Sequence, residues 1–172
     1  MTYRRLLSRQ FLFRHYWWIA ALAVLTSLVV TLELRPREVV PIMGSVLATG
    51  LAFCYFMQQQ RLAEIQLFKS LFTEFNARYN DMNSALASIA GSNRELAAAE
   101  CDVIVDYFNL CAEEYLFYKE GFIHPDVWSS WCAGMLWYFQ QEPFASEWAR
   151  ERTSDSYYGL TIERMREGAS KT

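Results

Sequence analysis

Hydrophobic and polar positions divide the chain into two regions with different rhythms. Two runs without any charged residue come first, at residues 16–32 and 39–57. From residue 58 onward the apolar residues recur at steps of three and four instead. Long apolar runs indicate membrane-spanning helices, whereas three-four spacing indicates amphipathic helices. The pattern predicts an all-α protein in which a two-helix transmembrane hairpin is followed by a cytoplasmic helical bundle.

The two charge-free runs have the length and the flanks of membrane spans. They contain 17 and 19 residues, and a helix that crosses a bilayer needs about 20, within a range of about 17–25. Aromatic residues favour the membrane interface, and they stand at the two ends that a hairpin brings together. These residues are Tyr16, Trp17, Trp18, Tyr55 and Phe56. No small-residue cleavage site follows the first run, so we do not expect a cleaved signal peptide.

Charge sets the expected orientation. Four arginines and no acid precede Tyr16, and Arg61 and Lys69 follow the second run, whereas the linker 33–38 has no net charge. Because basic flanks stay in the cytoplasm, we expect a multi-pass protein of the bacterial inner membrane with both termini cytoplasmic. The expected parts are a basic cytoplasmic tail (1–15), the transmembrane hairpin (16–57) and an acidic cytoplasmic helical domain (58–172).

The composition of the last part narrows the function classes. Residues 58–172 carry ten Lys and Arg against 17 Asp and Glu, a net charge of −7. This balance argues against nucleic acid as a partner, because nucleic acid calls for a basic surface. The four cysteines show neither C-x-x-C nor C-x-x-H spacing. We therefore expect reduced thiols, no zinc site and no cofactor.

The second run carries a face of small and hydroxyl-bearing residues. Ser45, Thr49 and Ala52 lie at positions i, i+4 and i+7 of one helix. Small residues let helices approach closely in lipid, so this face predicts packing of the two spans against each other. The alternative is a homo-oligomer in which such faces meet or line a pore. Neither span contains Asp, Glu, Lys, Arg or His, which argues against a proton relay or ion-coupled transport.

The bundle is predicted to begin as a continuation of the second span. Its apolar positions step by 3, 4, 3, 4, 3, 4 and 3, with no helix breaker between them and residue 57. They are Ile65, Phe68, Phe72, Phe75, Tyr79, Met82, Leu86 and Ile89. Aromatic residues are unusual in a two-stranded coiled coil. We therefore expect this seam to pack against its own domain, with an intermolecular bundle as the alternative.

Glycine and capping signals end this helix and begin the next. The Gly-Ser-Asn tripeptide at 91–93 breaks the pattern, and Ser92 with Glu95 fits a capping box. The helix that follows is expected to run to Lys119, with Gly121 as its C-terminal glycine.

Three shorter helices are predicted in the C-terminal third. One begins at Pro125, which suits the first turn of a helix, and another covers residues 144–151. Ser154 or Asp155 is expected to cap the last helix, which Gly168 stops.

Two adjacent glutamates are the first candidate site. Glu113 and Glu114 have apolar neighbours on nearly every side, so at least one carboxylate is expected to be partly buried. A buried carboxylate must find donors or take up a proton, and we expect a polar core network with Asn109, Tyr118 and the indole N–H of a tryptophan. A metal site with His124 or Asp126 is the alternative, although the spacing matches no standard ligand pattern. Trp128 and Trp131 are expected in the core or, alternatively, in a partner-binding groove.

The sequence carries no familiar catalytic signature. It contains no GxSxG, P-loop, GxGxxG or HExxH motif. Arg9 and His15 have R-x5-H spacing, which resembles the catalytic motif of HEPN ribonucleases, a family of helical bundles. The resemblance implies a residue pair that activates a ribose 2′-OH, but basic residues beside a membrane span are expected in any case.

Two stretches of the helical domain resemble known proteins. They are residues 75–80 (FNARYN) and residues 106–123 (DYFNLCAEEYLFYKEGFI), the latter followed by Trp128 and Trp131. Over about residues 67–148 the chain resembles a bacterial family of small uncharacterised membrane proteins that pair N-terminal spans with a helical domain. It is also similar to the membrane accessory proteins of RNA-targeting type VI-B CRISPR loci, which implies an oligomeric pore in phage defence. Neither resemblance supplies catalytic residues.

Three functions fit these expectations. The first is a non-enzymatic inner-membrane protein whose hairpin anchors a module for protein interaction or self-association. The second is an oligomeric membrane pore in CRISPR-associated phage defence, and the third is a HEPN-like ribonuclease. The expected partners are membrane lipid, further copies of the chain and a cytoplasmic protein of unknown identity.

Overall fold

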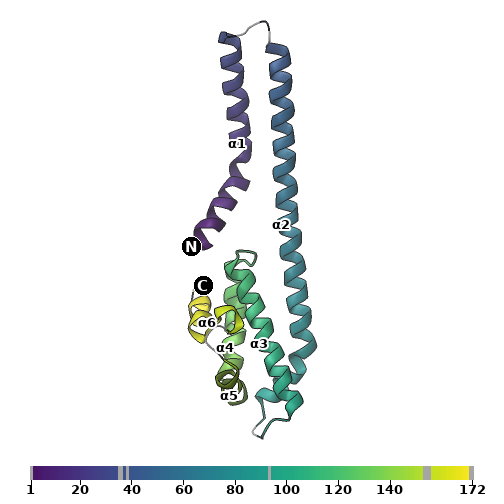
Figure 1. Cartoon of the computed structure of the whole chain (residues 1–172), viewed down its shortest axis with the longest axis vertical. Coiled ribbons are helices and arrows are strands. Elements are labelled where there is room, and N and C mark those ends of the chain that lie inside the picture. Colours follow the sequence, from purple (N-terminus) through teal and green to yellow (C-terminus); the bar gives the residue numbers. More distant parts are fainter. Residues whose placement is uncertain (1, 35–36, 38, 93, 153–155, 171–172) are drawn as a thin grey trace. The chain divides into compact units, whose positions relative to one another are not determined.

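The chain folds into helices, as its hydrophobic pattern predicts. The computed structural model describes residues 2–34, 37, 39–92, 94–152 and 156–170, and of residues 2–14 and 34 it describes the backbone alone. Within these ranges it contains six α-helices, short 3-10 segments and no strand (Figure 1). The predicted all-α class is therefore confirmed.

The chain divides into two compact units, residues 1–67 and residues 68–172. The first unit holds α1 (Thr2–Leu34) and the first part of α2 (Val39–Ala90). Helix α2 has 52 residues and continues from the second apolar run through the whole seam. The predicted helical continuity between the second apolar run and the seam is therefore confirmed, and the helix ends at the predicted break.

In the first unit, α1 and α2 meet along a narrow seam. Tyr16 of α1 packs with Cys54 and Met57 of α2 in a small buried cluster. Farther along, a Cβ atom placed on Gly50 would lie 3.9 Å from Cγ2 of Val24. Only 11% of the apolar window in α1 is buried, and only 6% of that in α2. Both helices are long and apolar enough to cross a membrane, and they expose most of their apolar surface.

Helix α3 (Ala98–Lys119) is the central element of the second unit (Figure 1). It contacts α4 (Pro125–Phe139), α5 (Glu142–Glu151) and the 3-10 helix η2 (Ser156–Gly159), while α4 also packs on α5 and α6 (Ile162–Ala169). The core they enclose is rich in aromatic and sulfur-bearing side chains. Its largest fully buried members are Trp128, Phe75, Phe108, Phe144, Leu86, Ile89, Ile104, Leu110, Ile123, Met165, Cys111 and Cys132.

The seam of α2 packs against its own domain over its C-terminal part. Phe75 and Ile89 are almost fully buried, whereas Phe72 is 39% exposed and Ile65 is 53% exposed. Trp131 of α4 lies where the seam changes from exposed to buried, because its ring centroid is 5.9 Å from those of both Phe72 and Phe75. From about residue 71 onward, the seam therefore packs against its own domain, as we expected.

The predicted start of the helix after the break is wrong. Helix α3 begins at Ala98, because the Glu100 carboxylate accepts a hydrogen bond from the Ala97 N–H at 2.9 Å and satisfies a free backbone donor there. The Ser92 hydroxyl instead accepts from the Arg94 N–H inside the preceding turn. Capping from a carboxylate three residues inside the helix does not require a polar residue at the cap itself.

The last helix also starts later than predicted. Helix α6 is capped by Thr161, whose hydroxyl accepts from the Arg164 N–H at 3.3 Å, while Ser154 and Asp155 lie outside the described residues. Before it, η2 holds Tyr157 and Tyr158 in the left-handed region, with φ of 58° and 55°. This conformation is strained for residues with a side chain.

Other predicted helix ends are confirmed. Gly121 closes α3 with φ of 85°, a conformation that glycine adopts without strain. Pro125 occupies the first turn of α4, and the His124 ring nitrogen Nδ1 accepts from the Asp126 N–H at 3.3 Å. Helix α5 begins two residues before the predicted range 144–151 and ends where predicted.

Candidate functional site

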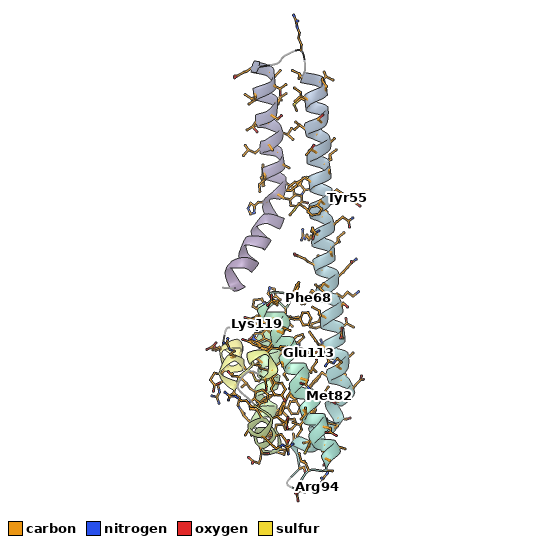
Figure 2. The ribbon with its side chains drawn as sticks, in the orientation of Figure 1. Tyr55, Phe68, Met82, Arg94, Glu113 and Lys119 are labelled. Carbon is orange, nitrogen blue, oxygen red and sulfur yellow. The ribbon has the colours of Figure 1, made fainter. Side chains whose placement is uncertain are left out.

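A polar groove of about 620 Å³ lies between α2 and α3 in the second unit. Met82 and Glu113, which line it, are labelled in Figure 2. The groove exists because each helix turns one polar face inward at helical spacing, three or four residues apart. The lining residues are Arg78, Asp81 and Met82 of α2, Asp106, Asn109 and Glu113 of α3, and Tyr158 of η2.

An ion pair crosses the groove. Arg78 Nη1 donates to Glu113 Oε2 at 2.5 Å, and Nη2 donates to Oε1 at 3.3 Å. Both side chains are 35% exposed. The hydrogen bond to Glu113 raises the pKa of the Arg78 guanidinium, so the arginine stays charged. The pair joins α2 and α3 within residues 75–80 and 106–123.

Glu114, the next residue along α3, is buried in the core. It is 7% exposed, and within the described part of the chain no hydrogen bond or ion pair holds its carboxylate. Burial raises the pKa of Glu114 to about 8, against the opposing effect of the Arg78 charge. Asn109, the expected network partner, is exposed. The structure thus shows a buried acid beside an ion pair where we predicted a shared network.

The two predicted tryptophans pack against aromatic rings. Trp128 is 2% exposed and stacks on Tyr118 with ring centroids 4.9 Å apart. Trp131 is half-buried and contacts two phenylalanines of α2, as described above. Their contacts are those of core residues.

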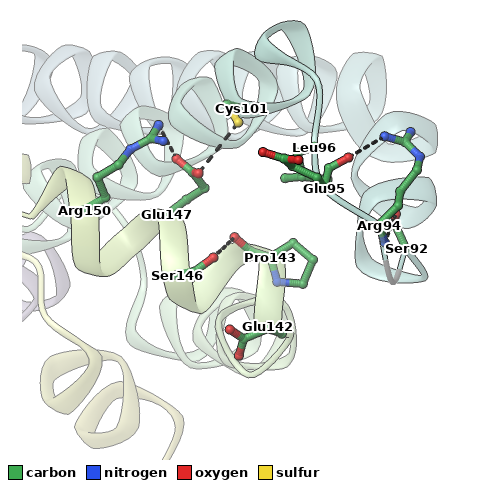
Figure 3. Close-up of a pocket in the computed structure, with 10 residues that line it drawn as sticks. All are labelled: Ser92, Arg94, Glu95, Leu96, Cys101, Glu142, Pro143, Ser146, Glu147 and Arg150. Carbon is green, nitrogen blue, oxygen red and sulfur yellow. Dashed lines mark hydrogen bonds and ion pairs between the residues drawn. The ribbon is translucent and has the colours of Figure 1, made fainter.

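A second pocket, of about 470 Å³, lies between α3, α5 and the turn before α3 (Figure 3). At its inner end the Cys101 thiol donates to Glu147 Oε1 at 3.6 Å, and Arg150 Nη2 lies 2.5 Å from Glu147 Oε2. Burial and the Glu147 charge raise the pKa of the Cys101 thiol. A thiol with a raised pKa is protonated and a poor nucleophile at neutral pH. The pocket therefore holds a structural cluster without an activated cysteine.

The small-residue face of α2 points away from α1. Ser45, Thr49 and Ala52 are all exposed, and the Ser45 hydroxyl donates to the Pro41 carbonyl of its own helix at 3.1 Å. The face toward α1 contains Gly50 and the buried cysteine described above. In the single chain these three residues are not used to pack the two helices together, and their role in an oligomer stays a prediction.

The structure bears on one of two alternative sites from the sequence. Among the described residues no group of three or more His, Cys, Asp and Glu side chains is placed to hold a metal ion, so Glu113 and Glu114 have no ligand set around them there. The R-x5-H pair stays a prediction, because the side chain of Arg9 lies outside the described residues.

Sequence reasoning missed most of the groove. Arg78, Asp81, Asp106 and Tyr158 were not expected to share a site with Glu113. One signal was present, since Asp106 lies seven residues before Glu113 and therefore on the same face of a helix. The facing residues on α2 have no such local signal, because Arg78 is 35 positions from its partner.

Comparisons with protein family models, with curated proteins and with solved structures find no match for this chain. The class that fold and site define is an all-α protein with two helices able to cross a membrane and a second unit with a polar groove.

Proposed function

We propose that the protein is a non-enzymatic inner-membrane protein, in which α1 and the first part of α2 form a transmembrane hairpin. The hairpin anchors the helical second unit, which acts in the cytoplasm as a module for protein interaction or self-association. The observation that carries this proposal is the exposed apolar surface of the two helices, together with the register in which they meet.

The register aligns the two charge-free runs. Tyr16 and Met57 share one cluster, so the first run begins where the second ends. Trp17, Trp18 and Tyr55 therefore lie near one level, 57%, 76% and 65% exposed. At about 1.5 Å per residue, helical runs of this length extend about 25–29 Å. A hydrocarbon core is about 30 Å thick, so both runs suit it, and the exposed aromatic residues suit its interface.

The exposed residues also favour lipid over water. Large apolar side chains such as Leu22 and Leu51 are 63% and 71% exposed along helices that carry no charge in these runs. Soluble proteins rarely leave contiguous apolar surfaces of more than a few hundred Å² in water. A core helix of a soluble protein would have most of this window buried, and here about nine-tenths of it is not.

Two matched substitutions on α2 test the membrane anchor. Leu47 lies near the centre of the second run and is 49% exposed, while Leu62 lies beyond it and is 51% exposed. A lysine at the centre of a span costs about 2.5–3.5 kcal/mol on insertion scales. We therefore expect Leu47→Lys to reduce the share of full-length protein that resists alkaline extraction from membranes, and Leu62→Lys to leave it unchanged. Equal behaviour of the two variants would contradict the membrane assignment.

The acidic second unit supports a cytoplasmic interaction role. Its groove presents Asp81, Asp106 and Glu113 against the single guanidinium of Arg78. The net charge of −7 over residues 58–172 favours a basic protein surface over nucleic acid. Charge reversal in the groove, with Asp81→Lys and Asp106→Lys, is expected to abolish capture of a basic partner but not membrane localisation.

A second candidate function is an oligomeric pore. The specific observation in its favour is that Ser45, Thr49 and Ala52 are exposed in the single chain and so are free to meet further copies. Ser45→Leu combined with Thr49→Leu is expected to lower the oligomer mass of detergent-purified protein in light scattering and to abolish conductance in planar bilayers. If the oligomer mass and the conductance are both unchanged, the pore function is refuted.

A further inference from the structure

In the described part of the chain, the seam of α2 is only partly covered before it enters the core of its own domain. Ile65 and Phe72 are 53% and 39% exposed, and Phe68 between them is half-buried. The ring centroids of Phe68 and Phe72 lie 5.9 Å apart, so the two rings follow one another along this face. From Phe75 onward the seam packs into the core. One continuous row of apolar residues therefore has a covered part and an uncovered part.

Lipid cannot cover these side chains in the membrane hairpin proposed above, on which this inference rests. Ile65 and Phe72 follow Met57, the last residue of the second charge-free run. At about 1.5 Å per residue, they lie about 12 Å and 23 Å beyond it along the helix. A headgroup layer is only about 5–8 Å deep on each side of the hydrocarbon core. The uncovered part of the seam therefore lies in water or against another protein chain.

Charge along the seam fits a parallel contact with a second copy. If Ile65 and Phe72 occupy heptad position a, Glu64 occupies position g and Lys69 the next position e. In a parallel pair of helices in register, position g of one helix lies beside the next position e of the other, and opposite charges there favour the pair. Glu64 of each copy therefore meets Lys69 of the other. Copies anchored in one membrane are already parallel, with the same residues at the same depth.

We propose that residues 64–72 of α2 bind the same residues of a second copy in a parallel, two-fold symmetric contact. The three uncovered seam residues pack against those of the other chain, and Glu64 pairs with Lys69 on both sides. A two-fold contact uses the same patch on both subunits, and a row of apolar residues is complementary to its own copy. The contact is a short crossing and not a long coiled coil, because the seam turns to its own domain at Phe75. Anchoring compensates for the short length, since it raises the effective concentration of the second copy.

Cross-linking between identical positions tests the contact. Full-length Ile65→Cys and Ala63→Cys are oxidised in isolated membranes, and non-reducing gels measure the disulfide-linked dimer. Both positions are exposed, but they point about 200° apart, since each residue turns the helix by about 100°. Ile65→Cys should form far more dimer than Ala63→Cys. The wild type, whose Cys54, Cys111 and Cys132 are buried, gives the background. Equal dimer yields at the two positions overturn the proposal.

Charge substitutions test the register. In the Ile65→Cys background, Glu64→Lys or Lys69→Glu alone puts like charges side by side. Each should lower the dimer yield about fivefold, which corresponds to about 1 kcal/mol. Glu64→Lys combined with Lys69→Glu should restore the yield, because opposite charges then meet with their positions exchanged. A combined variant whose yield stays as low as that of the single variants overturns the parallel register.

Resistance to alkaline extraction is measured on the same membranes, so that failure of the contact is distinguished from failure of the anchor. If Ile65→Cys resists extraction but cross-links no more than Ala63→Cys, the contact is refuted and the membrane anchor stands. If both variants are extracted, the anchor is refuted, and the contact that depends on it is refuted as well.

Discussion

Gly168 sits where α6 comes closest to α4, and replacing it tests whether the packing of the second unit is as tight as the structure shows. A Cβ atom placed on Gly168 would lie 2.6 Å from Cys132 Sγ and 2.6 Å from Trp128 Nε1. Real Cβ atoms do not approach other atoms this closely, so Gly168→Ala forces a shift. Neither neighbour has room, because Cys132 is fully buried and Trp128 is stacked on Tyr118.

The cost follows from the size of the added group. Forcing an extra methyl into a packed core costs about 1–3 kcal/mol. Alanine is better than glycine inside a helix by up to about 1 kcal/mol, which offsets part of this cost. We expect a net loss of about 1–2 kcal/mol for Gly168→Ala. Gly134 of α4 is the matched control, because no described atom lies within 4 Å of a Cβ placed there. Gly134→Ala should be neutral or stabilising.

Thermal unfolding of the full-length protein in detergent, followed by near-ultraviolet circular dichroism, measures both variants. At about 2–4 °C per kcal/mol for a chain of this size, Gly168→Ala should lower Tm by several degrees, and Gly134→Ala should not lower it. Labelling of Cys132 adds a local readout, since the thiol becomes accessible if α6 detaches. A Gly168→Ala variant as stable as Gly134→Ala would refute the close approach of α6 to α4.

Three further predictions concern charge and capping. Because the pKa of Glu114 is raised from 4.5 to about 8, its ionisation opposes folding increasingly as pH rises through this window. Chemical denaturation should therefore show wild type losing up to about 4 kcal/mol between pH 5 and pH 9 relative to Glu114→Gln. A double-mutant cycle on Arg78→Gln and Glu113→Gln should give a coupling free energy of at most about 1 kcal/mol, because both side chains are one-third exposed. A coupling free energy of zero would mean that the ion pair is not formed. Thr161→Ala should cost about 1 kcal/mol through loss of the α6 cap, seen as faster amide exchange in α6 alone, and unchanged exchange would contradict the cap.

Local patterns in the sequence were enough to predict much of the fold. Pro125 and Gly121 act through their own backbone geometry, so their effects on helix ends could be read directly. The continuity of α2 followed from the absence of breakers between the second run and the seam. The start of α3 could not be read in this way, because its cap comes from Glu100 inside the helix and the cap residue is an alanine.

The candidate site was less predictable because its decisive contact is not local. The sequence singled out Glu113 and Glu114 as a pair of equivalent acids in an apolar stretch. Consecutive residues of an α-helix point about 100° apart, since one turn takes 3.6 residues. That rotation places Glu113 toward the groove, where it pairs with Arg78, and places Glu114 in the core, where burial raises its pKa. Which of the two turns inward depends on where α2 lies, and α2 joins the core through residues far along the chain, such as Phe75 and Leu86. A site of this kind becomes visible only when the helices are placed, because its chemistry rests on the difference in burial between two neighbours of the same type.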